Sequence, residues 1–413
     1  MKYNILVVCF FYLLVSETSY AQQAFTVYNT VNSPLPDNSV LCISLDSLGR
    51  KWIGTAYGLA VYNDTSWTVY QTVNSGLSHN TIECISFDAS GIAWIGTQNG
   101  GVNKFDGSTW TVYNTFNSGL TSNYVRSIAI DSLGNKWICT DNGLNKFNDT
   151  TWVVYNTSNS GIPANYIACI AIASNTERWM GSVNGGFVLM QDTAFTVYDI
   201  VNSGFPDNTI LGIQIDTLGA KWMACPAGAL VRFYMGLFSS YNTGNSLSPS
   251  NSYDAVAIDS LQHVYLGSFD KGIVKKDGFN FYSYNTLNSG MPDDYVGSLA
   301  IERTGVIWAG TSSYGVVRFE EALFAGTPEL YTPSPVVLFP NPVRQLLNVV
   351  LPGPSAQSVR IYDLTGKMKF EQKISDSTNR ILQLNISCLL AGIYFISVNT
   401  GEKNFSRRFI KVE

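Results

Sequence analysis

The chain has few side chains that could transfer protons or bind a metal ion. Its 413 residues include two histidines, His79 and His263, and charged residues make up only 13%. Two imidazoles could ligate a metal, and one histidine with a serine and an aspartate could activate a nucleophile. No pair of carboxylates stands out, and no glycine-rich loop leads into a helix as phosphate binding would require. We therefore expect no metal and no cofactor, and we assign no catalytic residue.

A second set of residues could bind a ligand without catalysis. It combines tyrosines and asparagines with a few charged groups, which suits a sugar or a peptide in a shallow, partly apolar funnel. The set is Tyr57, Glu83, Asn99, Tyr124, Arg126, Asp141, Asn142, Tyr166, Asn184, Asp254, Asp270, Lys271, Tyr295 and Tyr314. A solvated rim with no ligand is the alternative. Since these residues are spread over more than half of the chain, the elements between them must bring them together.

A repeat of 42 or 43 residues supplies these elements. One anchor of the repeat is Trp52, Trp94, Trp137, Trp179, Trp222, Tyr265 and Trp308, and a second anchor is an aromatic-x-x-Tyr motif. In the first complete unit we expect strands at Val40–Leu45, Lys51–Thr55, Leu59–Tyr62 and Trp67–Tyr70. Four short apolar runs in a period of 40–45 residues are typical of a propeller blade.

The ends of the array indicate how it closes. Phe25–Tyr28 has the sequence of a fourth strand with no other three before it, and Val316–Phe319 is the third strand of a last unit that lacks its fourth. Pairing of the two would hide both exposed edges. The sequence therefore predicts an all-β fold: a seven-bladed β-propeller closed by the N-terminal strand, followed by a small C-terminal β-sandwich.

Several columns of the aligned repeats have structural explanations. Small residues, including five of the six cysteines after residue 21, occupy positions where inner strands crowd together, so we expect buried free thiols rather than disulfides. Asn38 and its equivalents should lock the turn into each inner strand, because Asn tolerates left-handed backbone and bonds its own chain. Asp46, Asp131, Asp216 and Asp259 precede hairpin turns, and we expect turn chemistry there rather than a metal.

Blade topology decides which residues share a face. The fourth-to-first and second-to-third loops should emerge on one face, with the candidate ligand-binding set, and the first-to-second loops on the other. His79 lies in a loop of the former kind and His263 in one of the latter. The two histidines therefore cannot form one metal centre, and a Ser-His-Asp triad would depend on His79 alone.

The N-terminal segment is typical of an export signal. Lys2 precedes an apolar run from Ile5 to Val15, and small residues at Ser19 and Ala21 fit signal peptidase, so residues 1–21 form a predicted signal peptide. No later run is long enough to span a membrane. The formal net charge is −5, and this weak acidity argues against a nucleic-acid partner, which would require a basic stripe on the surface.

The tail differs from the repeats. We expect a propeller over residues 22–321, a linker rich in Pro, Thr and Ser over 322–337, and a second domain over 338–413. Its expected strands are Leu346–Leu351, Val359–Tyr362, Ile381–Leu384, Ile393–Val398 and Phe405–Val412. Residues 338–413 hold 10 Lys+Arg and 5 Asp+Glu, whereas the remainder holds 15 and 25.

Two resemblances extend this interpretation. The segment Asp131–Leu144 resembles the two-component regulator propeller repeat, a family of extracytoplasmic sensor domains that often detect glycan fragments; here no kinase follows. The tail resembles the type A sorting domain of the type IX secretion system, through Phe339–Pro342, Val359–Lys367, Ala391–Phe395 and Phe409–Val412. That resemblance implies handling by the type IX machinery and a secreted or outer-membrane surface location in a Gram-negative bacterium.

Two functions follow as hypotheses. The first is a non-catalytic binding module for an extracellular glycan, peptide or protein. The second is an extracellular polysaccharide lyase or hydrolase in which a carboxylate, His79 or tyrosines act as acid and base. Sparse histidine and sparse charge favour the first.

Overall fold

The computed structural model describes residues 24–323, 329–330, 336–351, 356–363, 367–374, 381–399 and 404–412. The predicted signal peptide, residues 1–21, lies outside these ranges. In the described part of the chain the fold is all-β, and the one helical element named is a 3-10 turn, η1 (Glu321–Leu323). No helix among the described residues is long and apolar enough to cross a membrane.

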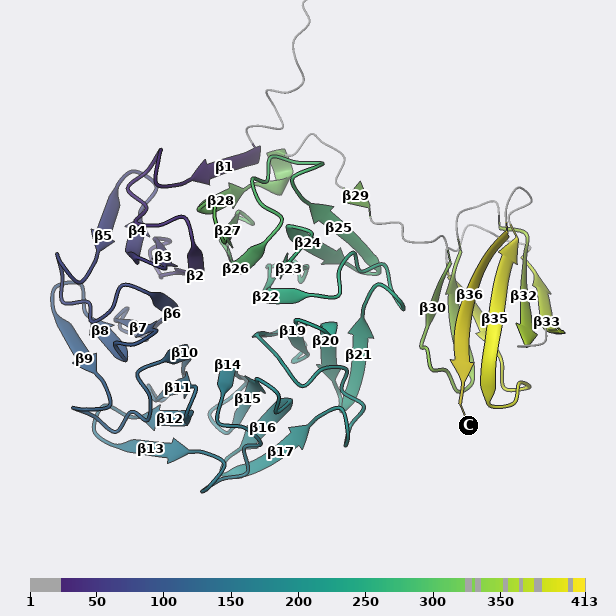
Figure 1. Ribbon diagram of the computed structural model, residues 1–413, viewed down its shortest axis with the longest axis horizontal. Coiled ribbons are helices and arrows are strands. Elements are labelled where there is room, and N and C mark those ends of the chain that lie inside the picture. Colours follow the sequence, from purple (N-terminus) through teal and green to yellow (C-terminus); the bar gives the residue numbers. More distant parts are fainter. Residues whose placement is uncertain are drawn as a thin grey trace, which may run out of the picture.

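Four-stranded antiparallel sheets follow one another in a ring (Figure 1). Their first strands are β2 (Val40–Leu45), β6 (Ile82–Phe87), β10 (Val125–Ile130), β14 (Ile167–Ile172), β18 (Gly212–Ile215), β22 (Tyr253–Ile258) and β26 (Val296–Ile301). Their second strands are β3 (Lys51–Thr55), β7 (Ala93–Thr97), β11 (Lys136–Thr140), β15 (Glu177–Ser182), β19 (Lys221–Cys225), β23 (Val264–Ser268) and β27 (Ile307–Thr311). First strands lie toward the centre of the ring.

The third and fourth strands complete each sheet toward the outside. The third strands are β4 (Gly58–Tyr62), β8 (Val102–Phe105), β12 (Gly143–Phe147), β16 (Phe187–Gln191), β20 (Ala229–Tyr234), β24 (Ile273–Asp277) and β28 (Val316–Phe319). The outermost strands are β5 (Trp67–Tyr70), β9 (Trp110–Tyr113), β13 (Trp152–Tyr155), β17 (Ala194–Tyr198), β21 (Leu237–Tyr241), β25 (Asn280–Tyr284) and β1 (Phe25–Tyr28). These bounds confirm the predicted strands of the first unit, with β4 one residue longer.

The N-terminal strand completes the last sheet, as the sequence predicts. β1 pairs antiparallel with β28, placing Phe25 opposite Phe319 and Tyr28 opposite Val316. The rings of Phe25 and Phe319 stack with centroids 4.3 Å apart. The first and last sheets also share an apolar core that includes Val40 and Trp308. The two ends of the array are therefore held together by strand pairing and by packing.

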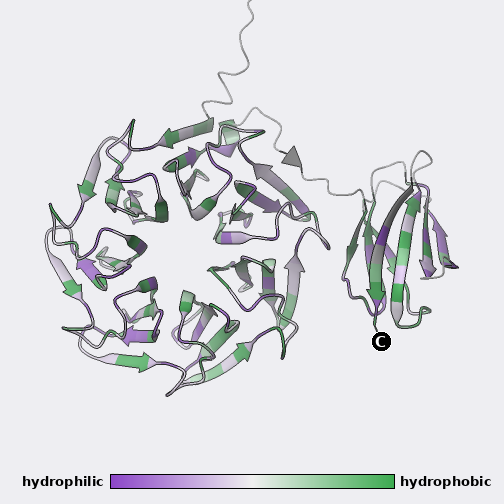
Figure 2. Cartoon of the chain, viewed as in Figure 1, coloured by the Kyte–Doolittle hydropathy of each residue, from purple (hydrophilic) through white to green (hydrophobic). Residues whose placement is uncertain are grey.

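Second strands are buried along all or nearly all of their length, because both of their faces pack against neighbouring sheets. Every residue of β3, β7, β11, β23 and β27 is buried. Hydrophobic residues accordingly mark the strands of every sheet (Figure 2). Glycine is needed where sheets approach closely: a Cβ on Gly54 would lie 2.5 Å from the Cys42 sulfur and 2.7 Å from an Ile82 methyl carbon. The expectation of a small-residue column is confirmed.

The acidic residues before the hairpin turns anchor the tryptophans. Oδ1 of Asp131 accepts backbone N–H groups of Leu133 and Asn135, while its Oδ2 accepts the indole N–H of Trp137 at 3.0 Å. Six sheets have such an acid–indole bond, at 2.5–3.2 Å, although Glu177 lies on the second strand rather than before the turn; the acids are Asp46, Asp88, Asp131, Glu177, Asp216 and Glu302. The sixth sheet differs, since Asp259 bonds His263 instead. These acids act in turn formation and packing, as predicted.

The asparagine column is also structural, but for a different reason from the one expected. None of its residues has a positive φ. Each side-chain oxygen instead accepts the backbone N–H of the residue eight positions earlier, at 2.7–3.0 Å; the acceptors are Asn38, Asn80, Asn123, Asn165, Asn208, Asn251 and Asp294. The column therefore closes the loop between each outermost strand and the next inner strand.

The C-terminal residues form two sheets around one apolar core. One sheet has the order β30 (Val337–Phe339), β31 (Leu346–Val350), β34 (Ile381–Asn385), and the other has β33 (Met368–Lys373), β32 (Ser358–Asp363), β35 (Gly392–Asn399), β36 (Asn404–Lys411). The core joins Leu347 and Leu384 of the first sheet to Val359, Ile396 and Phe409 of the second. β30 and β33 were not predicted. A further short strand, β29 (Glu329–Leu330), lies within the expected linker and pairs with β25.

Candidate ligand-binding site

A shift of pairing register recurs on the inner strands. In β2, β6, β10, β14, β22 and β26 one residue has no partner on the second strand, which is the pattern of a β-bulge. The residues skipped by the pairing are Leu41, Glu83, Arg126, Ala168, Asp254 and Gly297. Flanking positions are uniformly apolar or small, whereas this position varies from sheet to sheet. The inner-strand position that differs most between the repeats is therefore the unpaired residue of the bulge. A bulge changes the direction in which that side chain points.

The second-to-third loops lie on the same face as the loops that enter the inner strands. Thr81, which precedes β6, donates its hydroxyl to the carbonyl of Ala56 in the loop after β3. Gln71, which follows β5, donates its amide to the carbonyl of Tyr57 in that same loop. The expected grouping of these two loop sets on one face is consistent with these contacts.

Arg126 is the centre of the cluster that the structure assembles. Its guanidinium carbon lies 3.6 Å from the ring centroid of Tyr124 and 4.7 Å from that of Tyr166. Its Nη1 lies 3.7 Å from Oε2 of Glu83, a charge contact too long for a hydrogen bond. Two aromatic rings and one carboxylate, contributed by three successive sheets, therefore surround one cation.

Burial changes the acidity of the groups around Arg126. Desolvation raises the pKa of Glu83, and this effect outweighs the opposing charge of Arg126 and the hydrogen bond of Tyr124. Desolvation, followed by the Glu83 charge, raises the pKa of Tyr124; desolvation is also the main cause of the raised pKa of Tyr166. The cluster combines a fixed cation, a carboxyl that gains a proton more readily than usual, and two neutral phenols.

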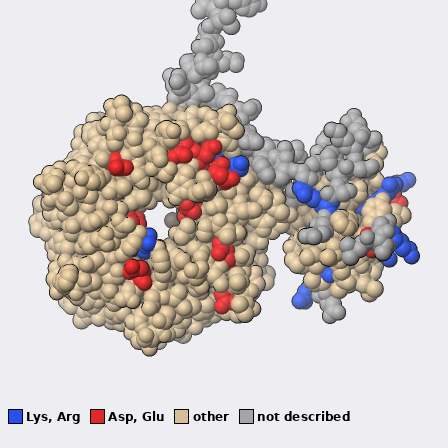
Figure 3. Space-filling view, viewed as in Figure 1, with Lys and Arg blue, Asp and Glu red and all other residues tan. Residues whose placement is uncertain are grey.

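A second group forms on the sixth and seventh sheets. Burial raises the pKa of Asp254 despite its hydrogen bond with Tyr295, and burial together with the Asp254 charge raises the pKa of Tyr295 to about 12. The ring of Phe269 packs edge-on against Tyr295 with centroids 5.5 Å apart. No contact among the described residues joins this group to the Arg126 cluster. Figure 3 shows acidic and basic side chains at the rim of the central opening.

The remaining predicted residues lie on the loops after the second strands, and several have local roles. Asp270 accepts the hydroxyls of Ser250 and Ser268, and Lys271 lies 3.8 Å from its carboxylate. Asn142 donates to the carbonyl of Thr121. Tyr57 and Tyr314 are 60% and 51% exposed. Asn99, Asp141 and Asn184 belong to the same loop set, Asn184 with a φ of 62°.

The sequence missed Phe269 and Gln98. Phe269 is 62% exposed, and the Gln98 side chain lies close enough to Tyr124 to oppose the rise of its pKa. Both lie on the second-to-third loops, so their loop position was the available signal. The described residues contain no group of three or more His, Cys, Asp or Glu side chains that could hold a metal ion.

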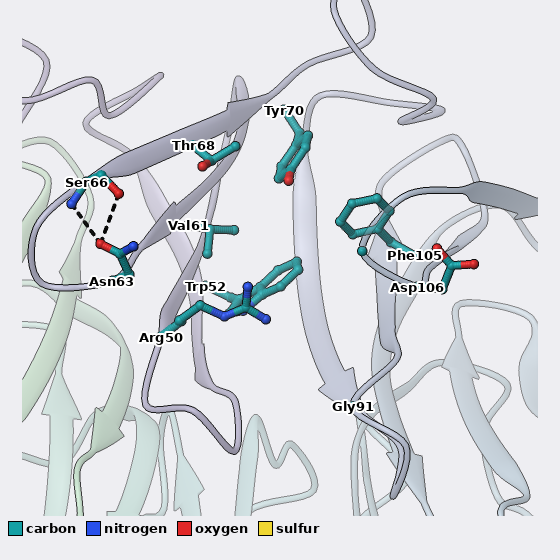
Figure 4. Close-up of a pocket in the computed structure, with 11 residues that line it drawn as sticks. Arg50, Trp52, Val61, Asn63, Ser66, Thr68, Tyr70, Gly91, Phe105 and Asp106 are labelled. Atoms are coloured by element: carbon teal, nitrogen blue, oxygen red, sulfur yellow. Dashed lines mark hydrogen bonds between the residues drawn. The ribbon is translucent and has the colours of Figure 1, made fainter.

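A cleft of about 150 Å³ lies elsewhere, between the first and second sheets. Arg50, Trp52, Tyr70, Phe105 and Asp106 are among its lining residues (Figure 4). Its loops are of the first-to-second and third-to-fourth kinds, which do not carry the predicted set. Arg50 already bonds Asp46 at 2.6 Å, and Asn63 accepts bonds from Ser66. The polar groups of this cleft are largely satisfied within the protein.

The tail matches a known family. Residues 337–412 match the secretion system C-terminal sorting domain. This confirms the predicted resemblance of the tail to type IX sorting domains. In Figure 3, Lys and Arg gather on this C-terminal unit, whereas acidic side chains are more frequent on the visible face of the ring. Comparison with curated protein sequences finds no match.

Solved structures share the fold of the chain. The extracellular domain of the hybrid two-component system BT3049 from B. thetaiotaomicron is 18% identical, with a TM-score of 0.63 over 94% of this chain and 55% of that one. PorZ, a surface component of the type IX secretion system of Porphyromonas gingivalis, is 17% identical, with a TM-score of 0.58 over 91% and 60%. Virginiamycin B lyase from Staphylococcus aureus is 14% identical, with a TM-score of 0.59 over 71% and 98%.

These likenesses show a propeller-like, all-β fold. The chain spans just over half the length of the BT3049 domain and three fifths of PorZ. The sorting domain supports a secreted or cell-surface location.

Proposed function

We propose that the ring is a seven-bladed β-propeller over residues 22–321, closed by β1, and that residues 338–413 form a small β-sandwich after a linker at 322–337. The pairing of β1 with β28 and the apolar core shared by the first and last sheets support closure. A signal peptide at 1–21 would take the chain to the periplasm, where the sorting domain hands it to the type IX machinery.

The mature propeller acts as a binding module for an extracellular glycan, peptide or protein, without catalysis. One observation carries this proposal: Glu83, Tyr124, Arg126 and Tyr166 converge from three sheets around the variable position of the inner strands. Packing alone does not call for a cation at that position, because Leu41, Ala168 and Gly297 occupy it in other sheets. Neither the fold nor the sorting tail suggests a nucleic-acid partner.

Binding to an array of glycans and peptides tests the proposal. Tyr124→Ala and Tyr166→Ala should weaken binding about tenfold or more, because each removes an aromatic wall of the cluster. Val73→Ala is the matched control, since Val73 is 87% exposed on a loop tip and lies outside the set. Unchanged affinity in both tyrosine variants would refute this placement, and the absence of any ligand would refute the binding function.

An enzyme remains the second candidate, and the raised pKa of Glu83 beside the Tyr124 hydroxyl favours it. A carboxyl and a phenol in contact are a usable acid–base pair. Incubation with extracellular polysaccharides separates the two functions: new reducing ends or unsaturated sugars establish catalysis, and binding without products supports the module.

A further inference from the structure

The hydrogen-bonding capacity of Arg126 is unused within the described protein. A guanidinium has five N–H donors. The structure records no hydrogen bond from the Arg126 side chain to another described residue, and its Nε is buried without a partner. The side chain is 24% exposed, so water reaches only part of it. A partly buried cation with unpaired donors is costly unless another group supplies the acceptors.

Two tyrosines pack against this cation. Their ring centroids lie 3.6 Å and 4.7 Å from the guanidinium carbon, and rings cannot accept all of its N–H groups, so these donors are the part of the side chain left for a partner. An arginine edge matches the two oxygens of a carboxylate in a bidentate arrangement. The geometry therefore favours a planar anion over a neutral group.

The surroundings favour a saccharide over a peptide. Exposed aromatic rings on loops of the same kind, Tyr57 on the first sheet, Phe269 on the sixth and Tyr314 on the seventh, provide further platforms for sugar faces around the ring. Neutral amides lie on the same loop set, at Asn99, Asn142 and Asn184.

We propose that Arg126 recognises the carboxylate of an acidic saccharide, such as a uronic acid residue. This rests on the proposed binding function and names the ligand class of that same site. Glu83 is the competing anion: its carboxylate faces Arg126 at 3.7 Å and opposes a ligand carboxylate. Protonation of Glu83 removes this competition.

Affinity should consequently depend on pH. The groups that act on Glu83 are Arg126 from β10, Tyr124 from the loop before β10 and His79 from the loop before β6. The Glu83 charge in turn acts on Tyr166 and on the thiols of Cys42 and Cys84. The thiols are neutral, because burial raises their pKa values. Since the pKa of Glu83 is raised, this carboxyl gains its proton at a higher pH than an ordinary glutamate, and the affinity for an acidic sugar should rise over the pH range in which Glu83 is protonated and the sugar is still ionised.

Calorimetry on the full chain tests this proposal. It compares the affinity for a short oligogalacturonide with the affinity for the same oligomer after its carboxyl groups have been reduced to alcohols. The acidic oligomer should bind about ten- to a hundredfold more tightly than the reduced one. Arg126→Met should abolish that preference, and Arg126→Lys, which keeps the charge and folds with less disturbance, should reduce it. Glu83→Gln should strengthen binding at neutral pH and remove the pH dependence.

Each other outcome has a defined meaning. Equal binding of the two oligomers by the unaltered protein overturns the proposal, as does binding of acidic peptides with no saccharide bound. Tight binding of neutral sugars alone would support the proposed binding function but would contradict the proposal that Arg126 recognises a carboxylate. Absence of binding to every glycan and peptide tested refutes the proposed function itself.

Discussion

The backbone N–H of Gly315 donates a hydrogen bond to the carbonyl oxygen of Asn38 across 2.9 Å, and this bond joins the last sheet of the ring to the first. The same bond recurs between other neighbouring sheets, as from Gly143 to Asn165 and from Gly272 to Asp294. The junction at the chain ends is therefore built like the internal ones. The stability of this junction depends on β1. The chain connects β1 to the first sheet, so only hydrogen bonds and packing hold it in the last sheet.

Phe25→Ala should destabilise the ring. The side chain is 6% exposed and stacks on Phe319, so its loss should cost about 3–5 kcal/mol of unfolding free energy. Urea unfolding followed by tryptophan fluorescence measures this. Val31→Ala, at a residue 91% exposed, should leave the free energy unchanged. Equal effects of both changes would show that β1 does not secure closure.

Stability should fall in acid through the acids that bond tryptophans. Burial opposes ionisation of Asp131, but hydrogen bonds from Trp137 and Asn135 outweigh it and lower its pKa. A lowered folded pKa gives stability that is present above the unfolded value near pH 4 and is lost as the pH falls through the folded value. Asp131→Asn should be less stable at pH 7 and lose less on acidification. Exposed Asp192→Asn should retain the acid dependence of the unaltered protein.

Gly54→Ala should destabilise the first sheet by about 1–3 kcal/mol, because the new methyl group would meet Cys42 and Ile82. Cys42 pairs with Gly54, and the equivalent pair in the fifth sheet is Gly212 with Ala224. The double change Cys42→Gly with Gly54→Ala should therefore cost less than the sum of the single changes. Additive costs, measured by urea unfolding, would argue against direct contact as the cause.

Glu321→Ala should loosen the segment that follows the ring. Glu321 accepts bonds from the Tyr265 hydroxyl at 3.0 Å, the Tyr284 hydroxyl at 2.5 Å and Lys275 Nζ at 2.7 Å. Loss of these charge-assisted bonds should cost about 2–3 kcal/mol. The adjacent Glu320→Ala, which breaks only the half-exposed pair with Arg318, should cost less than about 1 kcal/mol. Comparable losses would contradict a special role for Glu321.

One cysteine of the described chain should react rapidly with iodoacetamide in the folded protein. Cys388 is exposed, whereas Cys139, Cys169 and Cys225 are buried and Cys42 and Cys84 are partly buried, with pKa values that burial raises. Burial raises the pKa of Cys169 to about 12, so its reactive thiolate is scarce at neutral pH. Mass spectrometry should show one early adduct, absent after Cys388→Ser. Several early adducts would show that the ring opens readily.

The local parts of this structure were accessible from the sequence. Each strand of the repeat is a short apolar run, and each lies at a fixed distance from a tryptophan, so Lys51–Thr55 and its equivalents could be predicted correctly. Met368–Lys373 was missed because charged residues alternate along it, and most of its residues are exposed or half-buried at the edge of a sheet. The role of Asn38 was predicted, but its bonding partner eight residues away was not.

The sequence by itself determined the number of repeats, the pairing of β1 with β28 and the sorting tail, because these depend on periodicity and on motifs within short stretches of chain. Only the tertiary structure decided that the rings of Tyr124 and Tyr166 and the carboxylate of Glu83 lie close to the Arg126 guanidinium. Glu83, Arg126 and Tyr166 belong to different sheets and are about one repeat apart in sequence. They come together because the bulged inner strands pack side by side. The distances between side chains on different sheets cannot be predicted from the sequence pattern of any one repeat.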